Sequence, residues 1–125
     1  MCGIRFSRFQ ARNEYIMKLL IAGSRKIKEF DLSPYVPKNT TLIISGGADG
    51  IDTLAEQYAD THNISKLILL PEWSVYGKTA ALVRNKKMID EAESVLVIWD
   101  GQSKGSKFTI SYAKKQNKEL RVIII

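Results

Sequence analysis

"TLIISGGADGIDTLAEQYA", residues 41–59, contains the pattern that decides the fold. Apolar residues at 42–44 predict a buried strand, two glycines follow it, and an apolar stripe with helical spacing begins at Ile51. Strand, glycine turn and helix in this order form the basic unit of an α/β protein. The turn also bears on function, because its glycines allow a backbone close to a ligand, whereas Asp49 and Asp52 would repel an anion.

The same unit recurs along the chain. Nearly continuous apolar runs predict strands at 18–23, 41–47, 66–71, 94–101 and 120–125. Helical spacing of apolar residues predicts helices at 50–61, 79–93 and 106–118. Residues 26–39 allow only a short helix, because Pro34 and Pro37 interrupt the pattern. We therefore expect a three-layer, doubly wound α/β fold of the Rossmann-like type, with a five-stranded, mainly parallel sheet in the order 3-2-1-4-5.

Length and composition limit the class of protein. The 125 residues suit a single domain, which we place at residues 17–125 after an N-terminal extension, residues 1–16. The sequence shows no membrane span or signal peptide, and a lone cysteine, Cys2, allows no intrachain disulfide, so we expect a cytoplasmic protein without a membrane partner. One histidine and one cysteine give no zinc-type metal site. The net charge of +6 permits a nucleic acid or nucleotide partner, or only a solvated basic surface.

In such a sheet, ligands bind beyond the carboxyl ends of the strands, where the winding direction switches. The turns predicted to meet there are 22–26, 45–50, 71–78 and 100–106. Each of them contains glycine, which suits a backbone that approaches a ligand closely.

The turn "DGQSKGSK", residues 100–107, is the best candidate for a phosphate site. Gly105 and Ser106 lie where the last helix is expected to begin, so free N–H groups, the helix dipole and a hydroxyl would face a phosphate. Lys104 and Lys107 add positive charge. The alternative is a plain turn with Ser106 as N-cap. Asp100 either accepts hydrogen bonds from ribose hydroxyls or simply begins this turn.

The helix predicted at 79–93 carries two polar residues in or beside its apolar stripe. Asn85 lies within its apolar stripe, and because a buried amide needs partners, we expect it to bond to a backbone loop. Arg84 can bind a phosphate with two parallel hydrogen bonds, or form a surface ion pair with Asp90 or Glu91.

The loop 71–78 carries Trp73 and Tyr76 together with Lys78. Such aromatic side chains either stack on a base or cover the edge of the sheet. In the turn at 45–50, Asp49 is predicted to cap the helix, with Gly50 at its first position and Asp52 at its third. These carboxylates make that turn the less suitable one for phosphate.

Four stretches occur together in a recognisable order. "IAGSR", "SGGADGIDTLAEQYA", "PEWSVYGKTAALVRNKKMI" and "WDGQSKGS" resemble the SLOG superfamily of Rossmann-like nucleotide-binding proteins, in its YspA-related branch, over residues 17–125. The resemblance implies binding or sensing of a nucleotide or nucleotide-derived ligand, with no required cofactor. A homodimer is compatible with it, since relatives often dimerise. The pocket it implies is lined by Gly23, Ser24, Arg25, Gly46, Gly47, Arg84, Asn85, Gly101, Gly105 and Ser106.

Two relatives imply other functions. "SGGADGID" resembles DNA-processing protein A, which implies binding of single-stranded DNA, but the histidine usual there is missing after Asp52. Arg84 matches the arginine of the Lonely Guy-type nucleoside monophosphate phosphoribohydrolases, but Thr109 stands where those enzymes have a catalytic glutamate. The resemblance therefore disfavours phosphoribohydrolase activity and does not decide whether the protein is an enzyme.

Overall fold

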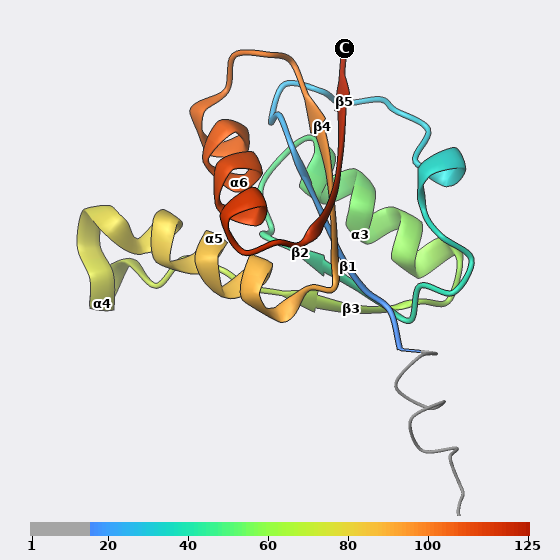
Figure 1. The fold of residues 1–125 in the computed structure, drawn as a ribbon, viewed down its shortest axis with the longest axis horizontal. Coiled ribbons are helices and arrows are strands. Elements are labelled where there is room, and N and C mark those ends of the chain that lie inside the picture. Colours follow the sequence, from blue (N-terminus) through green and yellow to red (C-terminus); the bar gives the residue numbers. More distant parts are fainter. Residues whose placement is uncertain (1–15) are drawn as a thin grey trace, which may run out of the picture.

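A computed structural model describes residues 16–125, so the predicted extension at 1–16 lies, apart from Ile16, outside the described residues. The strands are β1 (Lys18–Gly23), β2 (Leu42–Ser45), β3 (Ser65–Ile68), β4 (Ser94–Trp99) and β5 (Glu119–Ile124) (Figure 1). The α-helices are α3 (Ile51–Thr61), α4 (Trp73–Tyr76), α5 (Ala80–Glu91) and α6 (Lys104–Lys115). Two short 3-10 helices complete the fold, η1 (Ser33–Tyr35) and η2 (Gly77–Thr79).

All five strands are parallel, and their order is β3-β2-β1-β4-β5, which confirms the predicted fold class and sheet order. β1 lies at the centre, where Leu20 pairs with Ile44 of β2 on one side and with Val95 of β4 on the other. The chain thus adds β2 and β3 on one side of β1, and then crosses back to add β4 and β5. The winding direction switches between β1 and β4.

Helices cover both faces of the sheet (Figure 1). Side chains alternate along β1, so Leu19 and Ile21 pack with α3, whereas Leu20 packs with α5 and α6. All three are essentially inaccessible to solvent. Burial on both faces explains why the central strands read as continuous apolar runs rather than as alternating ones.

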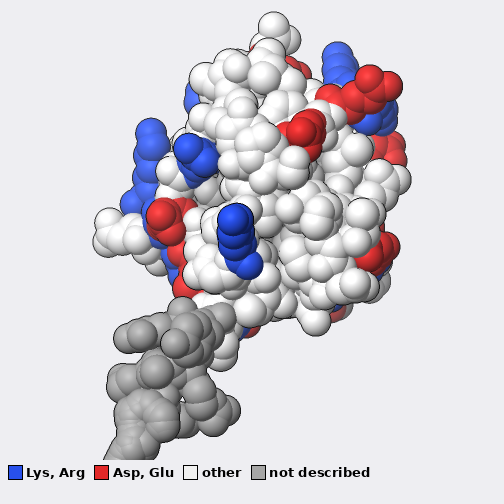
Figure 2. Space-filling model, turned by 90° about the vertical axis from the view of Figure 1, so that its right-hand side faces the viewer, with Lys and Arg blue, Asp and Glu red and all other residues white. Residues whose placement is uncertain are grey.

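The elements differ from the predicted ones mainly at their ends. β2 stops at Ser45 and β4 at Trp99, so the glycines that follow belong to turns. α6 begins at Lys104, two residues before the predicted start. The loop predicted at 71–78 contains the short helix α4, which projects from the body beside α5 (Figure 1). Within residues 16–125, no helix has the length and apolar character needed to cross a membrane. On the face that Figure 2 shows, charged side chains of both signs are scattered among uncharged ones.

Candidate functional site

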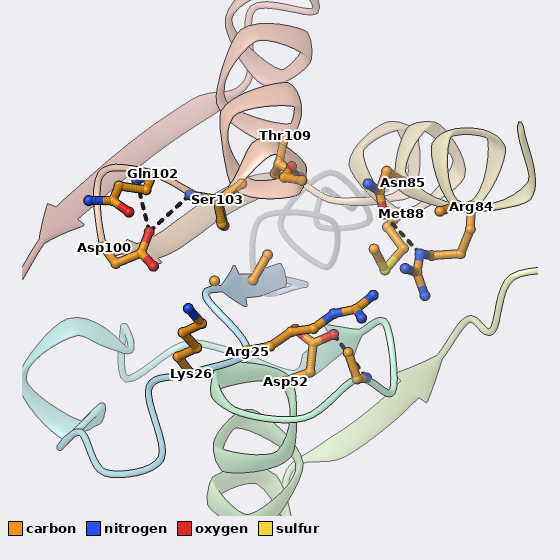
Figure 3. Close-up of a pocket in the computed structure, with 16 residues that line it drawn as sticks. Arg25, Lys26, Asp52, Arg84, Asn85, Met88, Asp100, Gln102, Ser103 and Thr109 are labelled. Atoms are coloured by element: carbon orange, nitrogen blue, oxygen red, sulfur yellow. Dashed lines mark hydrogen bonds between the residues drawn. The ribbon is translucent and has the colours of Figure 1, made fainter.

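A cavity of about 420 Å3 lies at the carboxyl ends of β1 and β4, where the winding direction switches. Its walls come from the turns after these strands, the first residues of α3 and α6, and one face of α5 (Figure 3). Of the four turns predicted to meet there, 22–26 and 100–106 line the cavity. The turn at 45–50 reaches it only through Ala48, and the turn at 71–78 does not reach it.

The turn after β1 holds three elements together. The buried Ser24 donates its N–H to the carbonyl of Ile98 in β4, and its hydroxyl accepts the N–H of Asp100; both distances are 3.0 Å. Its carbonyl accepts the N–H of Ile51 at the start of α3. A side chain on Gly23 would collide with the Ile98 carbonyl and the Ile51 side chain. Packing therefore explains the glycine and the serine, and Gly23 lines the cavity together with the next two residues.

Those two residues, Arg25 and Lys26, are exposed cations on the cavity wall. Arg84 lines the opposite end, and the carboxylates on the wall belong to Asp52 and Asp100. Figure 3 shows Lys26 on the same side as Asp100, whereas Arg25 extends above Asp52 toward Arg84. Three cations against two carboxylates make the cavity a better site for an anion than for a cation.

The start of α3 corrects one prediction. The helix begins after Gly50, which is its N-cap, and no side-chain cap hydrogen bond forms, so the predicted capping by Asp49 is wrong. Asp52 is the second residue of α3, and its carboxylate accepts the N–H of Ala48 at 3.1 Å. It is only 8% exposed. Burial raises the pKa of Asp52, while the Ala48 hydrogen bond and the charge of Arg84 act in the opposite direction.

The paired glycines of this turn make room for protein side chains. A Cβ atom on the buried Gly46 would lie 2.9 Å from both Arg84 Nη1 and Asp52 Oδ2. A Cβ atom on Gly47, whose φ is +73°, would lie 2.6 Å from the Leu70 side chain. Neither glycine lines the cavity, although both were predicted to do so.

Arg84 and Asn85 form a hydrogen-bonded pair on α5 (Figure 3). Arg84 Nη1 donates to the carbonyl of Gly46 at 2.6 Å and to that of Leu69 at 3.1 Å. Its Nε donates to Asn85 Oδ1 at 2.8 Å. Arg84 therefore binds the ends of two strands rather than Asp90 or Glu91. The partner of the buried Asn85 is this guanidinium, not the predicted backbone loop.

These bonds limit what Arg84 can offer a ligand. With Nε and Nη1 engaged, Nη2 is the nitrogen of Arg84 that has no hydrogen bond to the described residues. Two parallel bonds from Nε and Nη2 to one phosphate would require Nε to leave Asn85.

The start of α6 presents free donors to the cavity. The N-cap is Ser103, which makes no side-chain cap bond, and Ser106 is the third residue of the helix; the alternative, in which Ser106 is the N-cap, is wrong. Ser106 is 4% exposed and lines the cavity, and its hydroxyl has no partner among the described residues. A Cβ atom on Gly105 would have no atom within 4 Å. Since the first N–H groups of a helix lack acceptors within it, this wall can receive an anion.

Asp100 organises the turn before α6. Its Oδ1 accepts the N–H groups of Gln102 at 2.9 Å and Ser103 at 3.0 Å, and these bonds lower the pKa of Asp100. Gly101 adopts a φ of +83°, which the turn requires. The Ser24 hydroxyl also helps to lower the pKa of Asp100. Asp100 thus begins the turn and also lines the cavity.

Thr109 occupies the position where a Lonely Guy-type enzyme would carry its glutamate. It lines the cavity, is 3% exposed, and donates its hydroxyl to the carbonyl of Gly105 at 3.1 Å. This position therefore supplies no carboxylate. Among the described residues, no three His, Cys, Asp or Glu side chains form a group that could hold a metal ion.

The aromatic loop lies apart from the cavity. Trp73 is 58% exposed on α4, and Lys78 is exposed on η2. Lys87 of α5 lies 5.4 Å from the centre of the Tyr76 ring and 3.3 Å from Glu72, so these contacts fasten α4 to α5.

The predicted and observed sites overlap in part. The predicted residues that line the cavity are Gly23, Arg25, Arg84, Asn85, Asp100, Gly105 and Ser106. The predicted residues that do not line it are Ser24, Gly46, Gly47, Trp73, Lys78, Gly101 and Lys104. Wall residues that were not predicted include Ala22, Lys26, Ala81, Met88, Gln102 and Ser103. Lys26, Gln102 and Ser103 were within reach of prediction, because they lie in the two turns that form the cavity.

Comparison with known proteins gives no match to a family model, to a curated protein or to a solved structure. The description of the fold therefore rests on the order of the strands, and that of the site on the geometry of its residues.

Proposed function

We propose that the cavity binds a nucleotide or nucleotide-derived ligand, with a phosphate group at the start of α6. The observation that carries this proposal is the group of free donors at that wall. They are the N–H groups of the first turn of α6 and the Ser106 hydroxyl, beside an open space at Gly105. The helix dipole favours a negative charge there, and the cations Arg25 and Lys26 border the same cavity.

The rest of the cavity suits the remainder of such a ligand. The Asp100 carboxylate is an acceptor for sugar hydroxyls, at the end of the cavity that also holds Lys26 (Figure 3). Ala22, Ala81 and Met88 supply apolar surface for the flat face of a base. A volume of about 420 Å3 lies within the range of small-molecule sites.

The sequence resemblance supports the same proposal. The resemblance to the SLOG superfamily implies a nucleotide-type ligand at this edge of the sheet. Seven of the site residues that were predicted from the resemblance and the turns line the cavity. A nucleotide ligand and a lone cysteine also fit the expected cytoplasmic location. Thr109 argues against a phosphoribohydrolase that uses a glutamate at this position, so binding or sensing is the function proposed.

One observation favours a second candidate, single-stranded DNA. The exposed Trp73 lies on α4 with Tyr76 and Lys78 nearby, and exposed aromatic side chains among lysines can stack on bases. This surface does not belong to the cavity, so the two candidates depend on different residues.

Gly105→Asp tests the proposal without disturbing the fold. A Cβ atom added at Gly105 would meet no atom within 4 Å, and an aspartate in the first turn of a helix is favourable by about 0.3–1 kcal/mol. Its charge would lie beside the proposed phosphate, and two like charges about 4 Å apart repel by about 1 kcal/mol in water and more in a less polar site. We expect nucleotide affinity to fall at least about fivefold.

Isothermal titration calorimetry with a panel of ribonucleoside mono-, di- and triphosphates measures this effect. Gly105→Asn is the matched control, because it has the same size without the charge, and it should bind nearly as well as the wild type. Trp73→Ala should leave nucleotide affinity unchanged and should lower only the affinity for single-stranded DNA. Equal affinities for Gly105→Asp and Gly105→Asn, or a wild type that binds no member of the panel, would refute the proposal.

A further inference from the structure

The orientation of the Asn85 amide is fixed by chemistry. Asn85 is 9% exposed, lines the cavity, and faces Arg84 Nε at 2.8 Å (Figure 3). Because the Nε of arginine can only donate a hydrogen bond, the Asn85 atom that faces it is the oxygen. The Asn85 NH2 group therefore points away from Arg84.

Arg84 is itself held in place from two other segments. Its Nη1 donates to the carbonyls of Gly46 and Leu69, which follow β2 and β3. Rotating the Asn85 amide would place its NH2 group against Nε, and Arg84 cannot move aside without leaving two carbonyls unpaired. Arg84 thus acts as a positioning residue for Asn85.

The NH2 group of Asn85 is an unused donor at the cavity wall. Its Nδ2 has no hydrogen bond to the described residues, although more than nine-tenths of Asn85 is buried. Nδ2 is not among the fully enclosed unpaired atoms of the described chain, which are Thr40 Oγ1 and Ser103 Oγ. It therefore retains access to the cavity that Asn85 lines. A ligand that fills the cavity excludes water from Nδ2, and a donor left unpaired in this way is unfavourable. A ligand that places an acceptor beside Nδ2 avoids this cost.

We propose that Asn85 determines ligand specificity by requiring an acceptor oxygen where the ligand meets α5. This inference rests on the proposed function and names the chemistry that the site reads. The oxygen belongs either to an oxo group of the base, as in hypoxanthine and uracil, or to a phosphate. An amino group in that place, as in adenine and cytosine, would set donor against donor. Sites that pair a buried polar group with its substrate discriminate strongly against partners that cannot.

Asn85→Asp is the test that follows from this geometry. The substitution keeps the size of the side chain and the oxygen that accepts from Arg84, but replaces the NH2 donor by an acceptor. If the oxygen is on the base, wild-type protein should prefer inosine over adenosine monophosphate, and uridine over cytidine monophosphate, by about tenfold or more. Asn85→Asp should then reverse the preference. If the oxygen is on the phosphate, Asn85→Asp should lower the affinity for all four nucleotides and for inorganic phosphate by the same factor.

Asn85→Ala provides the control that adds no charge, and unfolding in urea checks that each variant is folded. If the oxygen is on the base, Asn85→Ala should abolish the preference between oxo and amino bases. If it is on the phosphate, Asn85→Ala should lower the affinity for all ligands by the same factor. Unchanged affinities of both variants for every ligand would overturn the inference, as would a wild-type preference for the amino bases. If wild-type protein binds no nucleotide at all, the proposed function itself fails, which calorimetry distinguishes from these results.

Discussion

Replacing Gly50 with alanine is expected to destabilise the protein through two separate effects. Gly50 has φ +75° and ψ −126°, a conformation that L side chains rarely adopt. It also lies against the turn after β1, so that a Cβ atom would come within 2.5 Å of the carbonyl oxygens of both Ser24 and Arg25. This contact matters for the site, because it sets the turn that carries Arg25 against the start of α3.

The magnitude follows from these two effects. A backbone conformation of this kind opposes a side chain by roughly 1–3 kcal/mol. Insertion of a methyl group into a packed region adds roughly 1–3 kcal/mol more, and here the neighbours are backbone atoms that cannot rotate away. We therefore expect Gly50→Ala to lower the free energy of unfolding by about 2–6 kcal/mol.

Gly77→Ala separates the two effects. Gly77 has nearly the same backbone conformation, with φ +57° and ψ −130°, but a Cβ atom there would meet nothing within 4 Å. Its alanine variant should lose only the conformational part, about 1–3 kcal/mol. Urea unfolding followed by circular dichroism measures both variants against the wild type. Equal losses for Gly50→Ala and Gly77→Ala would show that the close packing of the β1 turn on α3 is absent in solution.

Two further predictions concern the buried carboxylate and the core. Because burial raises the folded pKa of Asp52 above its ordinary 3.8, its contribution to stability is present in acid and is lost as the pH rises through that folded pKa. As the pH rises from 3 to 7, the wild type should therefore lose stability relative to Asp52→Asn. A difference in free energy of unfolding that does not depend on pH would contradict this. On α5, Ile89→Ala removes a fully buried side chain and should destabilise by about 2–5 kcal/mol, whereas the 44% exposed Leu82 should tolerate alanine within about 0.5 kcal/mol. Thermal unfolding compares these two variants, and similar losses would contradict the burial of this helix face.

The fold was predictable because its signals are local. Leu19, Leu20 and Ile21 are consecutive apolar residues, and only a strand covered on both faces buries all three. The order of strands then follows from parallel pairing and right-handed crossovers. The helix α4 was missed, because four residues between loops carry no periodic pattern.

The site was predictable in the turns that follow the central strands and, on α5, at Arg84 and Asn85, although the partners of these two residues were not. Gly105, Ser106 and Asp100 lie in the turn after β4, which the fold itself brings to the cavity. The partners of Arg84 are different in kind, since Gly46 is 38 positions and Leu69 is 15 positions away along the chain. Such contacts depend on how the ends of β2 and β3 pack on α5, and no spacing in the sequence encodes them. The same packing explains why residues 46 and 47 are glycines, because neighbouring side chains occupy the space that a Cβ atom would need.

The most direct test of the central claim is an NMR titration of 15N-labelled protein with the ribonucleotide panel. If the cavity at the ends of β1 and β4 is the binding site, the backbone amides of residues 23–26 and 103–106 should shift in a saturable way. The amides of α4, at Trp73–Tyr76, should stay in place, because this helix does not line the cavity. Shifts centred on α4, or no saturable shift with any nucleotide, would contradict the assignment of this cavity as a nucleotide site.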